Sequence, residues 1–150
     1  MTRKSKSRLR SATRELLLQA LYQWQLADHS LEELLLQFSQ RDEYTRIDSG
    51  YFEALLADIL VGHEEFTALI EDYADRSPGH LDPLGRAALL IGLAELKLRL
   101  DVPTKVVINE AVELAKRYGP TDGHRFVNAL LDRAAGNLVE RTNAGGPGGV

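Results

Sequence analysis

Histidine is the residue of this sequence best suited to metal binding or acid–base catalysis, and its spacing predicts neither role. The four histidines are His29, His63, His80 and His124. None of them is paired with another at a metal-ligand spacing. His63 and Glu64 begin like the zinc-protease motif His-Glu-x-x-His, but Thr67 stands where the second histidine is required. We therefore expect no metal site.

Acidic residues occur in adjacent pairs, which is a poor arrangement for catalysis. The pairs are Glu32-Glu33, Asp42-Glu43, Glu64-Glu65 and Glu71-Asp72. Neighbours on a helix point in different directions, so we interpret these carboxylates as solvated surface. The chain has no cysteine, which excludes thiol nucleophiles and Cys-ligated clusters, and it lacks a glycine-rich phosphate loop. These observations predict a protein that is not an enzyme, with no catalytic residue and no cofactor.

Basic residues are concentrated at the amino terminus, where they could neutralise phosphates. The first 14 residues hold no acid and six bases, namely Arg3, Lys4, Lys6, Arg8, Arg10 and Arg14. Residues 28–82 hold 14 acids against three bases, although the net charge of the whole chain is only −4. This polarity indicates an anionic partner at one end. Two alternatives stay open, an inert solvated terminus and an Arg- and Ser-rich targeting segment.

Tyr22 and Trp24 stand two residues apart, so on a helix they point in directions about 200° apart. Trp24 shares its side of the helix with Leu16, Leu17, Ala20 and Leu21. This pattern predicts that Trp24 belongs to the core and that Tyr22 faces outward. An outward tyrosine beside a basic arm can stack on a nucleic-acid base. An ordinary exposed tyrosine, or one covered by another helix, is the alternative.

Phe126 poses a similar question in the last helical segment. That segment is expected to bury Val127, Leu130, Leu131, Ala134 and Leu138. Phe126 lies about 95° from the centre of this apolar stripe, next to Arg125. It is therefore either a residue at the edge of the core or a platform on which a base can stack.

The elements that must position these residues are helices, because helical spacing dominates from residue 9 to residue 138. The pattern predicts an all-α fold of about seven helices in two small sub-bundles that share the fifth helix. The first expected helix runs over about 11–27, and the second begins at Ser30. The third and fourth lie between 48 and 76 and meet at Gly62. The last three run over 83–100, from Pro103 to 119, and from about 121 to 136. We expect a basic arm over residues 1–10, a single helical domain over 11–140, and a disordered Gly-rich tail over 141–150.

The fifth helical segment is apolar nearly all round, up to and including Leu98 and Leu100, which predicts a central and buried helix. Its apolar run is about half the roughly 18–20 residues needed to span a bilayer. We therefore expect a cytoplasmic protein with no membrane partner. Because the basic arm runs straight into a patterned helix, we interpret it as retained rather than cleaved.

Two segments of the chain resemble the NusB transcription antitermination factors. The stretch from Arg14 to Trp24, RELLLQALYQW, is similar to the first-helix signature of that family. The stretch from Asp101 to Gly119, DVPTKVVINEAVELAKRYG, is similar to its most characteristic segment. Asp122, RFVN at 125–128 and LD at 131–132 follow in the same order and spacing. The resemblance covers about residues 8–138.

This resemblance implies a non-enzymatic, all-helical protein that binds boxA RNA as a heterodimer with NusE, a small-subunit ribosomal protein. The complex joins other Nus factors and RNA polymerase and suppresses Rho-dependent termination. The RNA-binding residues that the resemblance implies here are Arg3, Lys4, Lys6, Arg8, Arg10, Arg14, Tyr22, Tyr118, Asp122, Arg125 and Phe126.

The resemblance also implies a NusE-binding set, which carries over less completely. Tyr73, Arg76 and Arg86 match, whereas Gly85 occupies the position of a partner-binding carboxylate, and Leu90 and Ala94 also depart from the family pattern. Three other readings stay open. One is the front domain of an RNA methyltransferase, which would need a cofactor-binding domain that these 150 residues lack. The others are a ribosome-assembly RNA chaperone and a purely structural homodimer.

Overall fold

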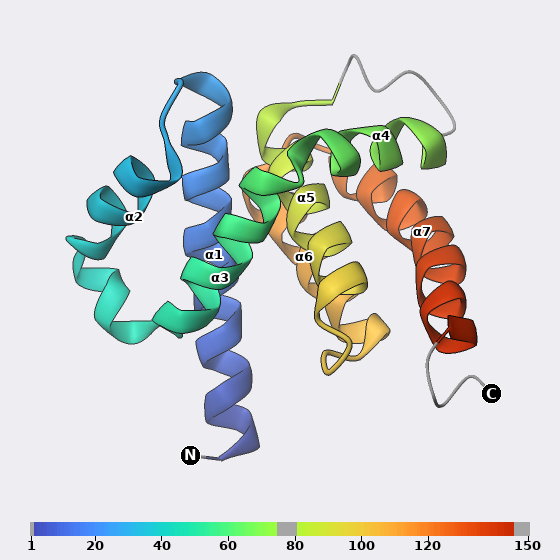
Figure 1. Ribbon diagram of the computed structural model, residues 1–150, viewed down its shortest axis with the longest axis horizontal. Coiled ribbons are helices and arrows are strands. Elements are labelled where there is room, and N and C mark those ends of the chain that lie inside the picture. The colour runs from blue at the N-terminus through green and yellow to red at the C-terminus, as the bar shows by residue number, and fades with distance from the viewer. Residues whose placement is uncertain (1, 75–80, 146–150) are drawn as a thin grey trace. The chain divides into compact units, whose positions relative to one another are not determined.

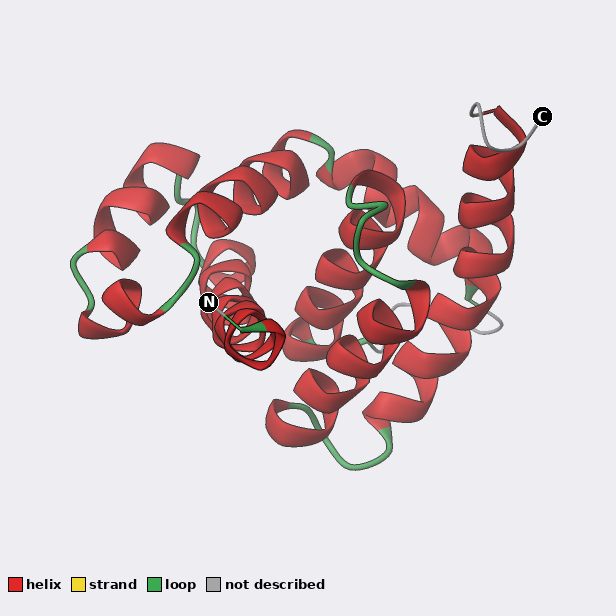
Figure 2. Cartoon of the chain, turned by 90° about the horizontal axis from the view of Figure 1, so that it is seen from below, coloured by secondary structure: helices red, strands yellow, loops and turns green. Residues whose placement is uncertain are grey.

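A computed structural model of the chain describes residues 2–74 and 81–145, with side chains described as far as residue 138. Within these ranges the chain forms seven α-helices and one short 3-10 helix, joined by short loops, and no strand (Figures 1 and 2). The elements are α1 (Arg3–Leu26), α2 (Leu31–Ser39), η1 (Asp42–Arg46), α3 (Ser49–Val61), α4 (His63–Tyr73), α5 (Pro83–Leu98), α6 (Thr104–Tyr118) and α7 (Gly123–Gly145). The predicted all-α fold is confirmed.

The chain divides into two compact units, Met1–Gly62 and His63–Val150. The boundary falls at Gly62, which caps the carboxyl end of α3 and which the sequence marks as a joint. The first unit contains α1, α2, η1 and α3, and the second contains α4 to α7. The fifth helix, which the sequence predicts to be shared, belongs to the second unit, where it contacts α4, α6 and α7.

In the first unit, α1 begins at Arg3, about two turns earlier than the sequence pattern predicts. Thr2 caps the helix, because its side-chain oxygen accepts a hydrogen bond of 3.1 Å from the Ser5 amide. Arginine and lysine also favour helix, since their straight side chains lose little rotamer freedom there. The expected arm over residues 1–10 is therefore mostly the first turns of α1.

The core of the first unit joins α2, η1 and α3 through aromatic rings. Phe38 and Phe52 are fully buried, with ring centroids 6.1 Å apart, and Tyr44 meets Phe52 edge to face at 5.7 Å. The predicted capping box at the start of α2 is confirmed, with Ser30 and Glu33 each accepting from the other's amide. Hydrogen bonds from Ser30 to the Glu33 carboxyl lower its pKa below the ordinary value of 4.5.

In the second unit, α5 is the central helix, and every residue from Ala87 to Leu96 is buried. Gly92 allows a close approach to α7, because a Cβ atom there would lie 2.8 Å from Leu131 Cδ1. The predicted burial of Leu98 and Leu100 is wrong, since they are 43% and 60% exposed. Leu98 is the last residue of the helix, and Leu100 lies beyond its end.

The other predicted core faces of the second unit are confirmed. α6 buries Val107, Ile108, Ala111, Leu114 and Ala115, and α7 buries Val127, Leu130, Leu131, Ala134 and Leu138. α7 continues to Gly145, beyond the predicted end at about residue 136, and so enters the predicted Gly-rich tail. The tail residues 146–150 lie outside the described residues. None of the described helices is long and apolar enough to cross a membrane.

Candidate nucleic-acid interface

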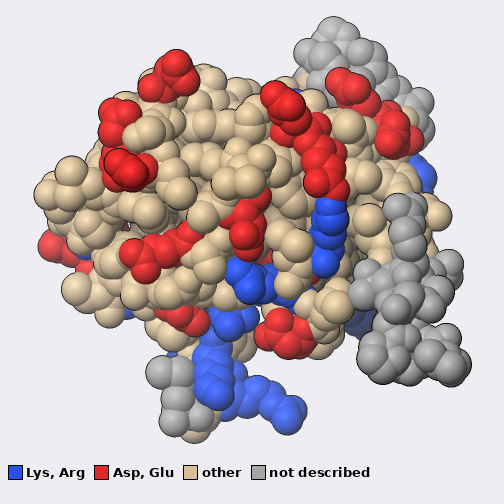
Figure 3. All heavy atoms as spheres, viewed as in Figure 1, with Lys and Arg blue, Asp and Glu red and all other residues tan. Residues whose placement is uncertain are grey.

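The first turns of α1 present an exposed basic segment, which we define as Arg3, Lys4, Lys6 and Arg8. All four side chains are exposed, as is every residue from 2 to 8. In Figure 3 the Lys and Arg side chains gather over this end of α1, at the bottom of the view. Because these turns are helical, the four cations are spaced along and around the helix axis. The segment can therefore meet several phosphates of one strand.

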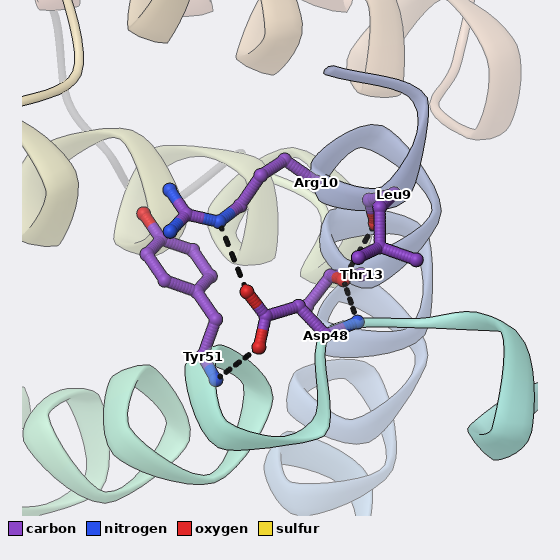
Figure 4. A network of polar contacts seen from close by, with 5 residues as sticks. All are labelled: Leu9, Arg10, Thr13, Asp48 and Tyr51. Carbon is purple, nitrogen blue, oxygen red and sulfur yellow. Dashed lines mark hydrogen bonds and ion pairs between the residues drawn. The ribbon is translucent and has the colours of Figure 1, made fainter. Parts of the chain in front are cut away.

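Arg10, predicted to bind RNA, makes contacts within the protein, although 31% of its side chain is exposed. Its Nε lies 3.4 Å from Asp48 Oδ2, and its guanidinium carbon lies 3.7 Å from the centre of the Tyr51 ring (Figure 4). Asp48 Oδ1 also accepts from the Tyr51 amide at 3.1 Å, so the same carboxylate caps α3. The structure thus gives the Arg10 guanidinium an internal partner on each side.

Arg14, also predicted to bind RNA, is only 3% exposed. On the helix it stands three, four and seven residues before Leu17, Leu18 and Leu21, all of which are buried. Arg14 therefore lies on the core side of α1. The structure thus sets Arg14 apart from the exposed basic segment, and its contact with RNA stays a prediction.

Tyr22 faces outward, as the sequence predicts, with 38% of its surface exposed. Around the helix axis it lies within about 40° of Lys4 and Arg8, and about 21 Å along the axis from Arg8. One side of α1 therefore carries both cations and an aromatic ring. Trp24, predicted to belong to the core, is only half-buried.

In the second unit, the end of α6 carries a second group of exposed cations and an aromatic ring. Lys116 and Arg117 occupy the last turn and are exposed, and Tyr118 is 38% exposed. Like Tyr22, Tyr118 offers a ring face on which a base can stack. Lys116 and Arg117 lie outside the predicted RNA-binding set. Their position directly before Tyr118 in the sequence is the signal that could have identified them.

The α6–α7 turn holds Asp122 in the left-handed region, with φ of 71°. Aspartate tolerates this conformation better than most residues, because its short polar side chain can bond locally. Its Oδ1 lies 3.7 Å from Arg125 Nε, and both side chains are exposed. Asp122 and Arg125 therefore form an ion pair at the start of α7, open to solvent.

Phe126 is only 9% exposed, and it follows directly on this exposed pair. The structure therefore favours the core-edge interpretation over the stacking platform. A base stacks on an exposed ring face, and so buried a side chain offers little surface for that. Its assignment to the RNA-binding set is not supported by the geometry.

The predicted partner-binding residues of the second unit are partly engaged in internal contacts. The Arg86 guanidinium donates to Thr67 Oγ1 at 2.7 Å, and the Tyr73 carbonyl accepts from Arg133 Nε at 2.7 Å. Arg76 lies outside the described residues. At Gly85, a Cβ atom would lie 2.7 Å from Asp82 Oδ1, so a larger residue there would displace the carboxylate that caps α5.

All eight members of the acidic pairs are exposed, which confirms that they are solvated surface. Two of them also act locally, since Glu33 closes the capping box and Glu65 pairs with Lys97. Among the residues that the structure describes, no group of three or more His, Cys, Asp or Glu is arranged to hold a metal ion.

The fold and these surfaces define a small all-helical protein whose first helix carries an exposed basic segment. A profile of the NusB family matches residues 11–136. The transcription antitermination protein NusB of Pseudomonas savastanoi pv. phaseolicola is 42% identical over 137 residues, covering 91% of this chain and 83% of that protein. That of Pseudomonas fluorescens is 44% identical over 136 residues, covering 91% and 82%. The chain belongs to the NusB family.

A solved structure shows the same fold. T. maritima NusB is 30% identical and aligns with a TM-score of 0.76, covering 85% of this chain and 90% of that chain. The family match begins at residue 11, so the basic segment at Arg3 to Arg8 lies before it.

Proposed function

We propose that this protein is a transcription antitermination factor that binds boxA RNA of nascent ribosomal transcripts together with NusE. In this role it helps RNA polymerase, with other Nus factors, to resist Rho-dependent termination. Support comes from membership of the NusB family, whose relatives carry the name transcription antitermination protein. The observation that carries the RNA-binding part is the exposed basic segment on the same helix as the exposed Tyr22.

The mechanism is that of an adaptor, in which charge supplies affinity and aromatic rings hold unpaired bases. Arg3, Lys4, Lys6 and Arg8 contact phosphates, while Tyr22 stacks on a base. In the second unit, Tyr118 offers another stacking surface, beside Lys116 and Arg117. The ion pair of Asp122 with Arg125 leaves its carboxylate able to accept from a base amino group.

NusE supplies the second RNA-contacting surface, so that the two proteins together bind RNA more tightly than either alone. We assign Tyr73, Arg76 and Arg86 to its docking surface. In the structure the Arg86 guanidinium donates to Thr67 on α4, which holds it at the α4–α5 contact. A carboxylate of the partner would find a preoriented cation there.

The test is fluorescence anisotropy at about 150 mM salt, close to physiological ionic strength. Labelled boxA RNA and a scrambled control are titrated with the protein alone and with NusE. A preference for boxA that sharpens when NusE is present is the expected result. Equal binding to both RNAs would reduce the protein to a non-specific RNA binder, and no binding with NusE present would refute the proposal.

Light scattering of the free protein, repeated with boxA RNA, completes the test. If the free protein is a homodimer that hides its RNA surface, addition of RNA is expected to convert it to a complex with one copy of the chain. A dimer that persists and binds no RNA would favour a purely structural role.

A further inference from the structure

Four residues of the first unit join α1 to α3 directly after the basic segment, and we call them the Arg10 clasp. They are Arg10, Thr13, Asp48 and Tyr51 (Figure 4). Besides the ion pair and ring contact of Arg10, the Thr13 hydroxyl accepts from the Asp48 amide at 2.9 Å and donates to the Leu9 carbonyl at 2.7 Å. The cap of α3, the ion pair and the Thr13 bond all meet at Asp48.

The clasp lies where α1 stops being exposed. Residues 2–8 are exposed on every side, residues 9–12 are half-buried, and Thr13 is fully buried. Two turns of helix without packing are only marginally stable in water. The conformational entropy lost in forming the first turn exceeds the stabilisation from so few hydrogen bonds. The helicity and direction of the basic segment therefore depend on how firmly the next turn is held, and Arg10 and Thr13 hold that turn.

We propose that Asp48 and Tyr51 are positioning residues for RNA binding: they hold Arg10 and so keep the basic segment helical and correctly directed. Arg10 then acts through the clasp and not as a phosphate contact. This inference rests on the proposed RNA-binding function. It assigns a role to Asp48 and Tyr51, which carry no signal of RNA binding in the sequence.

The direction in which substitution of Asp48 changes RNA affinity distinguishes this role from simple electrostatic repulsion. A carboxylate near a phosphate-binding helix repels RNA, so neutralising Asp48 would tighten binding if charge alone mattered. If Arg10 were a phosphate contact, freeing it from Asp48 would also tighten binding. The clasp predicts weaker binding, because a basic segment that has become flexible loses conformational entropy when RNA binding orders it again.

Three variants make the test. Asp48→Asn removes the charge and keeps the cap of α3, since asparagine caps helices as well as aspartate does. Arg10→Lys keeps the net charge and loses the planar guanidinium that stacks on Tyr51. Glu43→Gln, at an exposed acid of η1, is the matched control, because it changes the net charge as Asp48→Asn does.

Each variant is compared with the wild type by RNA affinity over a range of salt, by thermal midpoint, and by hydrogen exchange of the amides of residues 6–12. We expect Asp48→Asn and Arg10→Lys to weaken RNA binding by about two- to fivefold, the range that an exposed ion pair supplies. Their amides over 6–12 exchange faster, while the thermal midpoint stays near that of the wild type. Glu43→Gln exchanges normally and binds RNA equally or more tightly.

Binding by Asp48→Asn that equals or exceeds that of the wild type overturns the proposal, and so does unchanged exchange over residues 6–12. Hydrogen exchange needs no RNA, so the clasp is tested even if the wild type binds none. In that event the proposed function and the positioning role fail together. Faster exchange in Asp48→Asn would then still show that the clasp holds the helix.

Discussion

Tyr22 and Phe126 are two aromatic residues of the predicted RNA-binding set, and the structure separates them. Tyr22 is 38% exposed and stands on the cationic side of α1, whereas Phe126 is 9% exposed at the start of α7. Burial makes an aromatic ring a contributor to folding, and exposure makes it available to a ligand. Substitutions at these two positions are therefore expected to affect different measurements.

Phe126→Asp is expected to lower the free energy of unfolding by about 3–5 kcal/mol. It removes a buried ring and places a carboxylate in an apolar setting. Urea denaturation measures the loss, with Phe126→Leu as the apolar control that costs less. If Phe126→Asp is as stable as the wild type and only RNA binding is lost, the ring is a stacking platform after all.

Tyr22→Ala is expected to leave the free energy of unfolding within about 0.5–1 kcal/mol of the wild type, because the side chain is exposed. Its RNA affinity should fall by an amount equivalent to about 1–3 kcal/mol, the contribution of one base–aromatic stack. Fluorescence anisotropy measures the change, and Tyr22→Phe, which keeps the ring, serves as the control. Unchanged affinity in Tyr22→Ala would remove Tyr22 from the site.

The capping box of α2 gives a pH dependence whose sign follows from Glu33. Hydrogen bonds from Ser30 lower the pKa of this carboxyl in the folded protein below its ordinary value of 4.5. Its charge therefore adds stability above pH 4.5, and that stability is lost as the pH falls through the lowered value. Glu33→Gln keeps the hydrogen bond without the charge. Urea denaturation should show a larger free energy of unfolding for the wild type than for Glu33→Gln at pH 7, and this difference should close as the pH falls below 4.5.

At the scale of elements, two helical glycines have opposite surroundings. Gly92 on α5 faces Leu131 of α7, and a Cβ atom there would come within 2.8 Å of that side chain. Gly136 on α7 is exposed, and a Cβ atom there would meet nothing within 4 Å. The first glycine is thus required by packing between helices, and the second only lowers helix propensity.

Substitutions of these glycines are expected to change stability in opposite directions. Gly136→Ala should raise the free energy of unfolding by about 0.5–1 kcal/mol, because alanine has the higher helix propensity and α7 is already helical there. Gly92→Val should lower it by about 1–3 kcal/mol through overpacking against Leu131. Thermal or urea denaturation compares the two. A destabilised Gly136→Ala would mean that α7 is not a continuous helix at this position.

At the scale of the whole molecule, the net charge of −4 conceals a local concentration of positive charge on α1. The exposed cations Arg3, Lys4, Lys6 and Arg8 stand at one end of the first unit, and acids dominate residues 28–82. Such polarity orients an approaching polyanion and raises its association rate. It also makes the proposed RNA binding depend on salt.

Replacing the four exposed cations with glutamine keeps helix propensity and removes the positive charge. The slope of log affinity against log salt should then fall by up to about 3, since each phosphate contact to single-stranded RNA contributes about 0.7. The loss should be similar for boxA and scrambled RNA, because phosphate contacts carry no sequence information. Arg46→Gln on η1 is the control. An unchanged slope in the fourfold variant would exclude the basic segment from the interface.

The sequence by itself determined the order of the helices, the cap of α2 and most of the buried faces. The capping box at Ser30 and Glu33, the boundary at Gly62, the buried stripe of α7 and the outward direction of Tyr22 all follow from it. These features depend on interactions within a few residues, on the 3.6-residue period and on the hydrogen bonding of helix ends. The NusB resemblance rests on contiguous motifs of the same local kind.

Only the tertiary structure decided which charged and aromatic side chains remain available to a ligand. Six bases look equivalent in the first 14 residues of the sequence. In the structure, however, Arg10 contacts Asp48 and Tyr51, which are more than 30 positions away, and Arg14 is buried on the core side of α1. Phe126 likewise turned out to be buried, and Leu98 and Leu100 exposed. The helical period shows which residues of one helix share a face. Which of those faces a neighbouring helix covers depends on packing between segments that are distant in the sequence.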